Sequence, residues 1–193
     1  MYVRRVELRF PVQEAPVGFD LQAADWMAPH GAGKVADLFF TYTAKGQGLS
    51  IVTNELVIAC TNHLDGLIRS NKDMFSEFRS AYEAPLSGYQ PFVKFGLEQG
   101  KQVSLKSERL DEKEYLIFRV RTVLDEKGNI VSARYGKING PISYGRAAPD
   151  TEQGSVSFTC YFNPDGTQNL EFDPANNLRP DSNSRDFRRV SVP

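Results

Sequence analysis

The sequence predicts an α+β fold: an antiparallel β-sheet system, most simply a sandwich, with a helical hairpin at about 54–84 packed on one face. Two observations lead to this prediction. Apolar and polar side chains alternate with a period of two along most of the chain, which is typical of half-buried strands. Between 54 and 84 the apolar residues instead recur every three or four positions, which is typical of amphipathic helices. With 193 residues and 40% hydrophobic content, the chain is expected to form one domain, 1–193.

The N-terminal part is expected to contain two strands separated by a long connection. The first strand covers 3–10, where apolar and charged residues alternate. Residues 11–34 are rich in proline, glycine and alanine, so they predict an irregular connection. The second strand covers 34–43, which is rich in aromatic and β-branched side chains, and 49–53 can form its return strand.

The segment from 54 to 84 predicts two consecutive helices. Thr53 or Asn54 can cap the first and Ser70 or Asn71 the second with a side-chain oxygen, and Pro85 marks the end of the second. Two helices this close must form a helical hairpin or one kinked helix, whose apolar stripes would cover sheet residues such as Phe118 and Phe158. The stripes consist of Leu56, Ala59, Cys60, His63, Leu64, Leu67 and Ile68, and then of Met74, Phe75, Phe78, Ala81 and Tyr82.

Beyond Pro85 the period of two returns and predicts antiparallel strands at 90–99, 101–110 and 114–138. The last of these contains a hairpin, whose loop at 126–128 would set Val120 opposite Arg134 and Leu124 opposite Ile130. The same register brings Arg119 against Tyr135, a possible cation–π pair.

A second hairpin is predicted at 155–172, with a loop of Pro164, Asp165 and Gly166. Its register places Phe158 and Cys160 on an apolar face, with Cys160 opposite Leu170. The polar C-terminal tail, about 173–193, is expected to lie on the surface, with 187–192 as a possible final edge strand.

Composition excludes several function classes. The net charge is −1, so no overall positive field favours nucleic acid. No run of eighteen apolar residues predicts a membrane span, and the N-terminus shows no signal peptide. A structural zinc site needs about four nitrogen or sulfur ligands, and the chain has only two cysteines and two histidines, with no CxxC or Cys/His cluster; zinc is therefore discounted, and no cofactor or metal is expected. The fragment His30–Lys34 lacks the spacing of a phosphate loop.

The cysteines and acidic residues offer two candidate catalytic groups. Cys60 and His63 would share a helix face, but that face is apolar, so buried free thiols at Cys60 and Cys160 are favoured over a disulfide between them or a nucleophile. Paired carboxylates of a glycan-directed hydrolase form the alternative reading. Their candidates are Asp111, Glu112, Glu114, Asp150 and Glu152.

Tyrosines and arginines of the central strands are the best candidate binding residues. Exposed on a sheet, such side chains can stack on sugar rings or contact carboxylates; the competing explanation is that they form cross-strand pairs that stabilise the sheet. The candidates are Tyr115, Arg119, Arg121, Arg134, Tyr135 and Tyr161.

The C-terminal half also carries a resemblance, in "RVRTVLDEKGNIVSARYGKINGPI" and "SVSFTCYFNPDGTQNLEFDPANNL". Over about 118–178 the chain resembles a group of uncharacterised envelope proteins, often lipoproteins, of anaerobic gut bacteria. The resemblance implies a β-rich module at the cell surface or in the periplasm, although no lipobox is visible, and it carries over no catalytic residue. We therefore expect a non-catalytic extracytoplasmic binding or assembly module for a glycan or protein, of unspecified oligomeric state, with the hydrolase as alternative.

Overall fold

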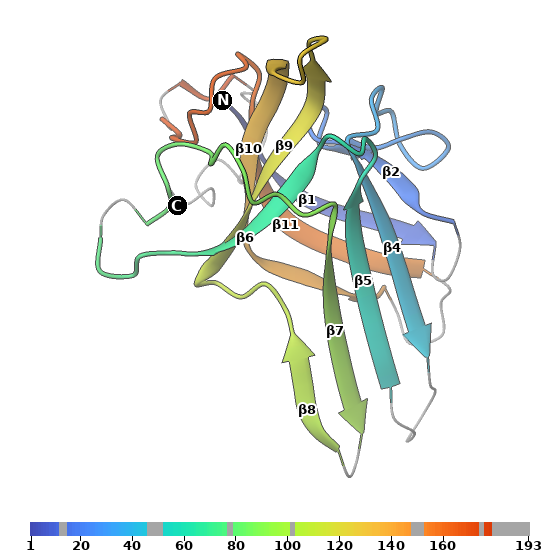
Figure 1. The fold of residues 1–193 in the computed structure, drawn as a ribbon. Coiled ribbons are helices and arrows are strands. Elements are labelled where there is room, and N and C mark those ends of the chain that lie inside the picture. The colour runs from blue at the N-terminus through green and yellow to red at the C-terminus, as the bar shows by residue number, and fades with distance from the viewer. Residues whose placement is uncertain are drawn as a thin grey trace.

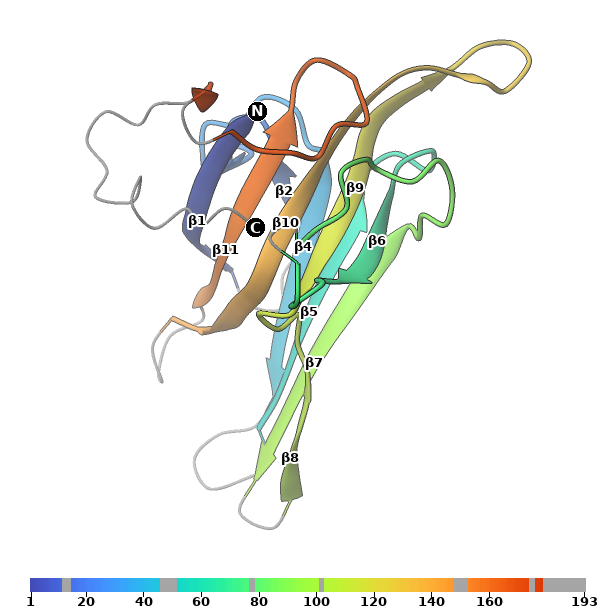
Figure 2. The same cartoon turned by 90° about the vertical axis from the view of Figure 1, so that its left-hand side faces the viewer.

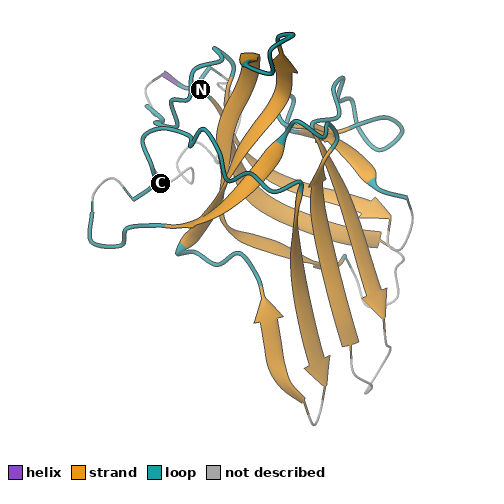
Figure 3. Cartoon of the chain, in the orientation of Figure 1, coloured by secondary structure: helices purple, strands orange, loops and turns teal. Residues whose placement is uncertain are grey.

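A computed structural model describes residues 1–11, 15–45, 52–76, 79–100, 103–147, 153–173 and 176–178. Within these ranges the chain forms eleven strands in two antiparallel sheets (Figure 1). Figure 2 shows the sheets as two layers, and Figure 3 shows strands and loops through almost all of the described chain. No helix among the described residues is long and apolar enough to cross a membrane.

The five-stranded sheet has the order β1-β11-β10-β9-β6. Its strands are β1 (Tyr2–Pro11), β11 (Gln153–Asn163), β10 (Ile130–Arg146), β9 (Glu114–Leu124) and β6 (Gly66–Asn71). The six-stranded sheet has the order β3-β2-β4-β5-β7-β8. Its strands are β3 (Asp25–Trp26), β2 (Val17–Asp20), β4 (Leu38–Lys45), β5 (Val52–Cys60), β7 (Phe92–Gly100) and β8 (Val103–Glu108).

The inner faces of the two sheets share one hydrophobic core. Alternation in β4 turns Leu38, Phe40 and Tyr42 inward. The Phe40 ring stacks on Phe158 of β11, with ring centroids 5.9 Å apart and planes 5° apart. Such aromatic pairs are worth about 0.5–1.5 kcal/mol beyond the area they bury, so this pair helps to hold the layers together.

Along one side of the sandwich the backbones of the two sheets also meet. Leu67 of β6 exchanges two backbone hydrogen bonds with Gln90, which lies just before β7, at N···O distances of 2.8 and 2.9 Å. These bonds satisfy backbone groups that an edge strand would otherwise leave open.

The predicted helical hairpin at 54–84 is wrong, and the α+β class with it. Residues 54–60 belong to β5 and 66–71 form β6, while the described part of 72–84 is irregular. Leu56 and Ile58 both point into the core, with the period of two that a strand requires. The apparent helical spacing arose because two short strands are joined by a five-residue turn, and short apolar runs do not discriminate helix from strand. Phe78 of the second stripe lies outside the described residues.

Most of the predicted strands are confirmed. The predictions at 3–10, 34–43, 90–99, 101–110 and 114–138 correspond to β1, β4, β7, β8 and the β9–β10 hairpin. The register of that hairpin is also confirmed, with Val120 opposite Arg134 and Leu124 opposite Ile130. The connection at 11–34 differs from the prediction, because it contains β2 and β3.

The prediction of a hairpin at 155–172 is correct for its first strand and wrong for its second. Phe158 and Cys160 face the core, and Gly166 adopts the expected positive φ of 83°. The return segment does not pair with β11, because β1 and β10 already occupy both edges of that strand: Cys160 lies opposite Arg4 and Ile138 instead. The possible strand at 187–192 lies outside the described residues.

Two irregular segments, the described part of 72–90 (72–76 and 79–90) and 164–173, cover the outer face of β9 and β10; we call them the cover segments. They are joined by hydrogen bonds from the Ala84 amide to the Gln168 carbonyl and from the Leu170 amide to the Tyr82 carbonyl, both 2.8 Å. Beneath them lies a second, smaller apolar cluster of Ala84, Tyr115, Ile117, Ala133, Tyr135 and Leu170.

Candidate functional site

The cover segments bury the tyrosines of the predicted binding surface. Tyr115, Tyr135 and Tyr161 are 3%, 5% and 0% exposed. The Tyr115 hydroxyl accepts a hydrogen bond from the Ala81 amide at 2.9 Å, so this ring fastens the cover to the sheet. The three tyrosines therefore do not lie on an open face, and Figure 2 shows the segment that follows β11 crossing in front of the upper ends of β11 and β10.

Arg119 and Arg134 are engaged at the margin of the covered face. The Arg119 guanidinium lies 4.5 Å from the centroid of the Tyr89 ring and donates to the carbonyls of Leu64 and Leu86 at 2.9 and 3.2 Å. Tyr135 lies opposite Arg119 in the sheet, as predicted, but the cation–π partner is Tyr89. Arg134 donates to the adjacent Ala133 carbonyl at 2.9 Å.

Arg121 leaves the face predicted for it because β9 bulges at this point. Arg121 and Thr122 together oppose the single residue Ala133, and Arg121 has a φ of +56°. A bulge of this kind re-aims a side chain. The backbone amides of the two bulged residues both donate to one buried carboxylate: Asp65 accepts from Arg121 at 3.0 Å and from Thr122 at 2.9 Å.

The re-aimed guanidinium enters a buried group of carboxylates on the other sheet. Its Nε lies 2.8 Å from Asp37 Oδ1, and its terminal nitrogen NH2 lies 3.0 Å from Asp37 Oδ2 and 3.4 Å from Asp20 Oδ1. Asp20 also accepts from four backbone amides in the β2–β4 connection, at Gln22, Ala23, Lys34 and Val35. This cluster joins the β2–β4 connection to the five-stranded sheet.

The pKa values of Asp37 and Asp20 are shifted in opposite directions by burial and hydrogen bonding. Burial raises the pKa of Asp37, although Arg121 and the Leu21 amide oppose the shift. At Asp20 burial also acts to raise the pKa, but the amides of Ala23, Lys34 and Val35 and the charge of Arg121 outweigh it, so the pKa is lowered. Since the oxygens are occupied by protein donors, the cluster acts as a clamp between elements rather than as an open reaction site.

A buried lysine is a second charged group that sequence reasoning did not single out as buried. Lys137 of β10 is 2% exposed beneath the cover segments. Its Nζ donates to Ser80 Oγ at 2.7 Å and lies 5.3 Å from the centroid of the Tyr161 ring. Burial lowers its pKa to about 8, opposed by the charge of Glu171 and reinforced by Lys72.

The low pKa of Lys137 predicts a rise in stability with pH. Between the folded pKa of about 8 and the ordinary value of 10.5, the unfolded chain binds a proton that the folded chain lacks. The free energy of unfolding therefore rises as the pH increases. The difference in unfolding free energy between wild type and Lys137→Met should change by about 1 kcal/mol per pH unit between pH 8 and 9.5, in favour of wild type at the higher pH.

Urea unfolding of both proteins across this range measures the effect. The range ends below the pKa of about 12 to which burial raises the Tyr42 and Tyr89 hydroxyls. A constant difference between the two proteins would show that Lys137 does not titrate there.

The candidate catalytic groups that lie within the described residues are not arranged as a reaction centre. Cys60 ends β5, and burial, with the charges of Asp65 and Asp37, raises its thiol pKa to about 12, while His63 is exposed in the following turn. Glu114 accepts two hydrogen bonds from Arg69, at 2.7 and 2.8 Å, and Arg69 lowers its pKa, the reverse of what a general acid needs. Asp111 and Glu112 are exposed, and Asp150 and Glu152 lie outside the described residues.

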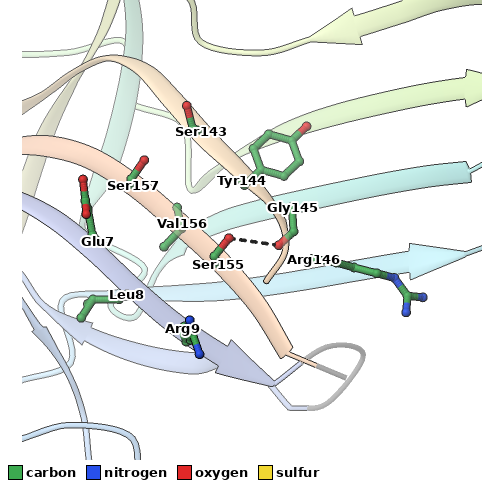
Figure 4. Close-up of a pocket in the computed structure, with 10 residues that line it drawn as sticks. All are labelled: Glu7, Leu8, Arg9, Ser143, Tyr144, Gly145, Arg146, Ser155, Val156 and Ser157. Carbon is green, nitrogen blue, oxygen red and sulfur yellow. Dashed lines mark hydrogen bonds between the residues drawn. The ribbon is translucent and has the colours of Figure 1, made fainter. Parts of the chain in front are cut away.

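The outer face of β1, β11 and β10 carries an open polar groove of about 580 Å³ (Figure 4). Two rungs of the sheet form its floor: Glu7, Ser157 and Ser143 lie side by side, followed by Arg9, Ser155 and Gly145. Because the middle strand carries only serines here, the floor lies low between its neighbours. The remaining lining residues are Leu8, Tyr144, Arg146 and Val156.

A second depression, of about 380 Å³, meets the groove at Ser143, which lines both. It is bounded by the turn 109–113 and by the bulge of β10 at 139–143. The Ile142 amide donates to the Leu110 carbonyl at 3.1 Å, which holds the turn against the strand. Arg109 lies 5.5 Å from the centroid of the buried Tyr144 ring. Together the two depressions form an elongated track.

Sequence reasoning missed the residues of this groove because serine, glycine and single charges in strands form no motif. The available signal was the outward position of Ser155 and Ser157 next to a charged strand, but their partner β1 lies more than 140 residues away in the chain. Asp20 and Asp37 left a clearer signal, since each adjoins apolar residues that enter a strand.

The described residues contain no group of three or more histidine, cysteine or acidic side chains arranged to hold a metal ion. The groove combines a hollow with several polar side chains from separate strands. Comparison of this chain with protein-family models, curated proteins and solved structures gave no match.

Proposed function

We propose that this protein is a non-catalytic binding module that holds a neutral glycan chain in the groove on β1, β11 and β10. The observation that carries the proposal is the groove itself: an open track, floored by serine hydroxyls and flanked by a carboxylate and a guanidinium. A serine hydroxyl both donates and accepts, a carboxylate accepts and a guanidinium donates, so the surface can complement a ligand rich in hydroxyl groups.

The charges of the groove favour a neutral ligand over an anionic one. Glu7 lies on its floor and pairs with Arg5 at 2.8 Å, so a carboxylate stands where an anion would have to approach. Arg9 and Arg146 add positive charge at the end of the groove near Gly145 (Figure 4). This mixed pattern suits sugar hydroxyls better than sulfate or carboxylate groups.

The elongated shape favours a chain over a single sugar. The second depression continues the track at Ser143 toward the turn 109–113. A chain lying along both depressions would contact three strands and one turn, each contributing a few polar contacts. The extracytoplasmic setting implied by the sequence resemblance is part of the proposal and accords with a glycan ligand.

Binding is favoured over hydrolysis because the carboxylates of the described residues are not arranged as an acid and a base. The described carboxyl group whose pKa is raised is Asp37, and both of its oxygens are held by Arg121, with Leu21 as a further donor. Asp37 belongs to the buried cluster with Asp20 and Arg121 and does not line the groove. A hydrolase needs two carboxylates that face a common cleft.

The test is a steric block of the groove. An added Cβ at Gly145 meets nothing within 4 Å, so Gly145→Trp can fold with its side chain over the groove floor. We expect wild type to bind at least one of a panel of neutral polysaccharides (a β-1,4-glucan, a xylan, a mannan and starch) in affinity electrophoresis, and Gly145→Trp to bind at least tenfold more weakly.

Val131→Trp is the matched control, because Val131 lies at the opposite end of the same strand and is 65% exposed. It should bind as wild type does, and binding to the neutral chain should change little between 50 and 500 mM salt. Equal binding by Gly145→Trp and wild type, release of reducing sugar, or binding confined to an anionic polysaccharide and lost in salt would each contradict the proposal.

A further inference from the structure

The outer face of the other sheet carries an exposed pair of aromatic rings. Phe39 of β4 and Phe92 of β7 are 37% and 54% exposed. Both lie opposite Ala59 of β5, so Phe39, Ala59 and Phe92 form one rung across three neighbouring strands. We call this rung the aromatic platform. In Figure 1 β4, β5 and β7 lie in front of β1 and β11.

The register sets the spacing of the two rings. Two steps between neighbouring antiparallel strands separate the Phe39 and Phe92 backbones by about 10 Å, and the alanine between them leaves the floor low. This distance is about the length of a disaccharide unit in an extended sugar chain. A chain running across the strands can therefore place one sugar on each ring.

The next rung supplies polar groups beside the platform. It consists of Thr41, Val57 and Lys94, and the Lys94 ammonium pairs with Glu55 of the following rung at 2.6 Å. The pair leaves the area close to neutral while keeping donors and acceptors at its edge. An aromatic face with hydroxyl-binding groups along one side matches a sugar, whose rings have a C–H face and a hydroxyl rim.

The area of the patch favours a sugar chain over a protein. With 37% and 54% of their surfaces exposed, the two rings offer about 200 Å² in total. A stable protein interface buries about 800 Å² on each partner. Val35, 41% exposed in the connection before β4, adds too little to close this gap.

We infer that the aromatic platform is a second glycan site, on which an extended neutral sugar chain stacks over Phe39 and Phe92 across β4, β5 and β7. The inference takes its ligand class from the proposed function, but it concerns the opposite sheet and different residues. The module would then contact glycan on both of its faces, one by hydrogen bonding and one by stacking.

The experiment compares Phe39→Ala, Phe92→Ala and the double variant with wild type on the same polysaccharide panel. Removal of either ring should weaken binding about tenfold, and removal of both should weaken it further. Phe75→Ala is the control, since Phe75 is fully exposed on a cover segment without a second ring opposite it, and should bind as wild type does. Circular dichroism should show an unchanged fold, because both rings are on the surface.

Amide NMR spectra with a soluble oligosaccharide of the bound type locate the contact. Shifts at Phe39, Ala59 and Phe92 support the inference. It is overturned if shifts appear at Ser143, Ser155 and Ser157 alone, or if the phenylalanine variants bind as wild type while Gly145→Trp loses binding; the groove proposal then stands. Loss of binding in the phenylalanine variants alone supports the platform as a glycan site and contradicts the proposal for the groove. Self-association of wild type that disappears in the double variant, without sugar binding, would assign the platform to a second copy instead.

Discussion

Replacing Arg121 by methionine should lower the free energy of unfolding by about 3–5 kcal/mol, the loss typical when one member of a buried ion pair is removed. The Asp37 side chain is 1% exposed and the Asp20 side chain 6%, so neither charge can be solvated by water once the guanidinium is gone. Methionine keeps much of the aliphatic stem, which isolates the loss of the charge. Denaturant unfolding followed by circular dichroism measures the change.

Arg134→Met is the matched control, because Arg134 lies on the neighbouring strand and donates only to the Ala133 carbonyl among the hydrogen bonds described for it. It should cost less than 1 kcal/mol. Adding Asp37→Asn to Arg121→Met removes the uncompensated charge while keeping an acceptor for the Leu21 amide. This double variant should be more stable than Arg121→Met alone; a loss equal to the sum of the two single changes would show that the pair is not coupled.

Gly140→Ala should destabilise the protein by about 3 kcal/mol or more, at the high end for added volume in a packed interior. Gly140 lies in the bulge of β10, where the strand crosses the backbone of the turn that precedes β9. An added Cβ would overlap the Asp111 carbonyl oxygen and lie 2.6 Å from that of Glu114. Both obstacles are backbone atoms, so neither can rotate away as a side chain could.

The same change five residues later is the control for Gly140→Ala. Gly145 lies on the same strand, and a Cβ there meets no atom within 4 Å, so Gly145→Ala should leave the melting temperature within about 2 °C of wild type. If Gly140→Ala were equally harmless, the turn 109–113 would not be pressed against β10 as described. The second depression of the track would then lose its wall.

The fold could be predicted where side-chain periodicity was unambiguous. In β1 and β9 the period of two, and in β4 the aromatic and β-branched composition, gave the correct strands, and the charged turn at 125–129 gave the correct register for β9 and β10. In β5 and β6 the run of alternating residues is interrupted by the turn at 61–65. Apolar residues on both sides of this turn happen to recur at the spacing of a helix. Periodicity alone does not separate these cases when each run is short.

The sites depend on pairing that the sequence does not display locally. Ser157 joins Glu7 and Ser143 only because β11 lies between β1 and β10, and Phe39 joins Phe92 only because β5 lies between β4 and β7. The predicted tyrosine surface differs for a related reason. Tyr115 and Tyr135 do lie on the predicted strands, opposite Asn139 and Arg119, but segments far away in the chain fold over them.

The pairing of β1 with β11 also determines when the chain can finish folding. Residues 2–11 align with 153–162, so the first of the described strands must wait for the last of them. Until β11 has been synthesised, β1 therefore has an open edge and leaves Val6 and Phe10 unburied. A nascent chain stopped short of β11 is expected to be prone to aggregation, and the full chain to fold slowly for its size, since its sheet closes through contacts so distant in sequence.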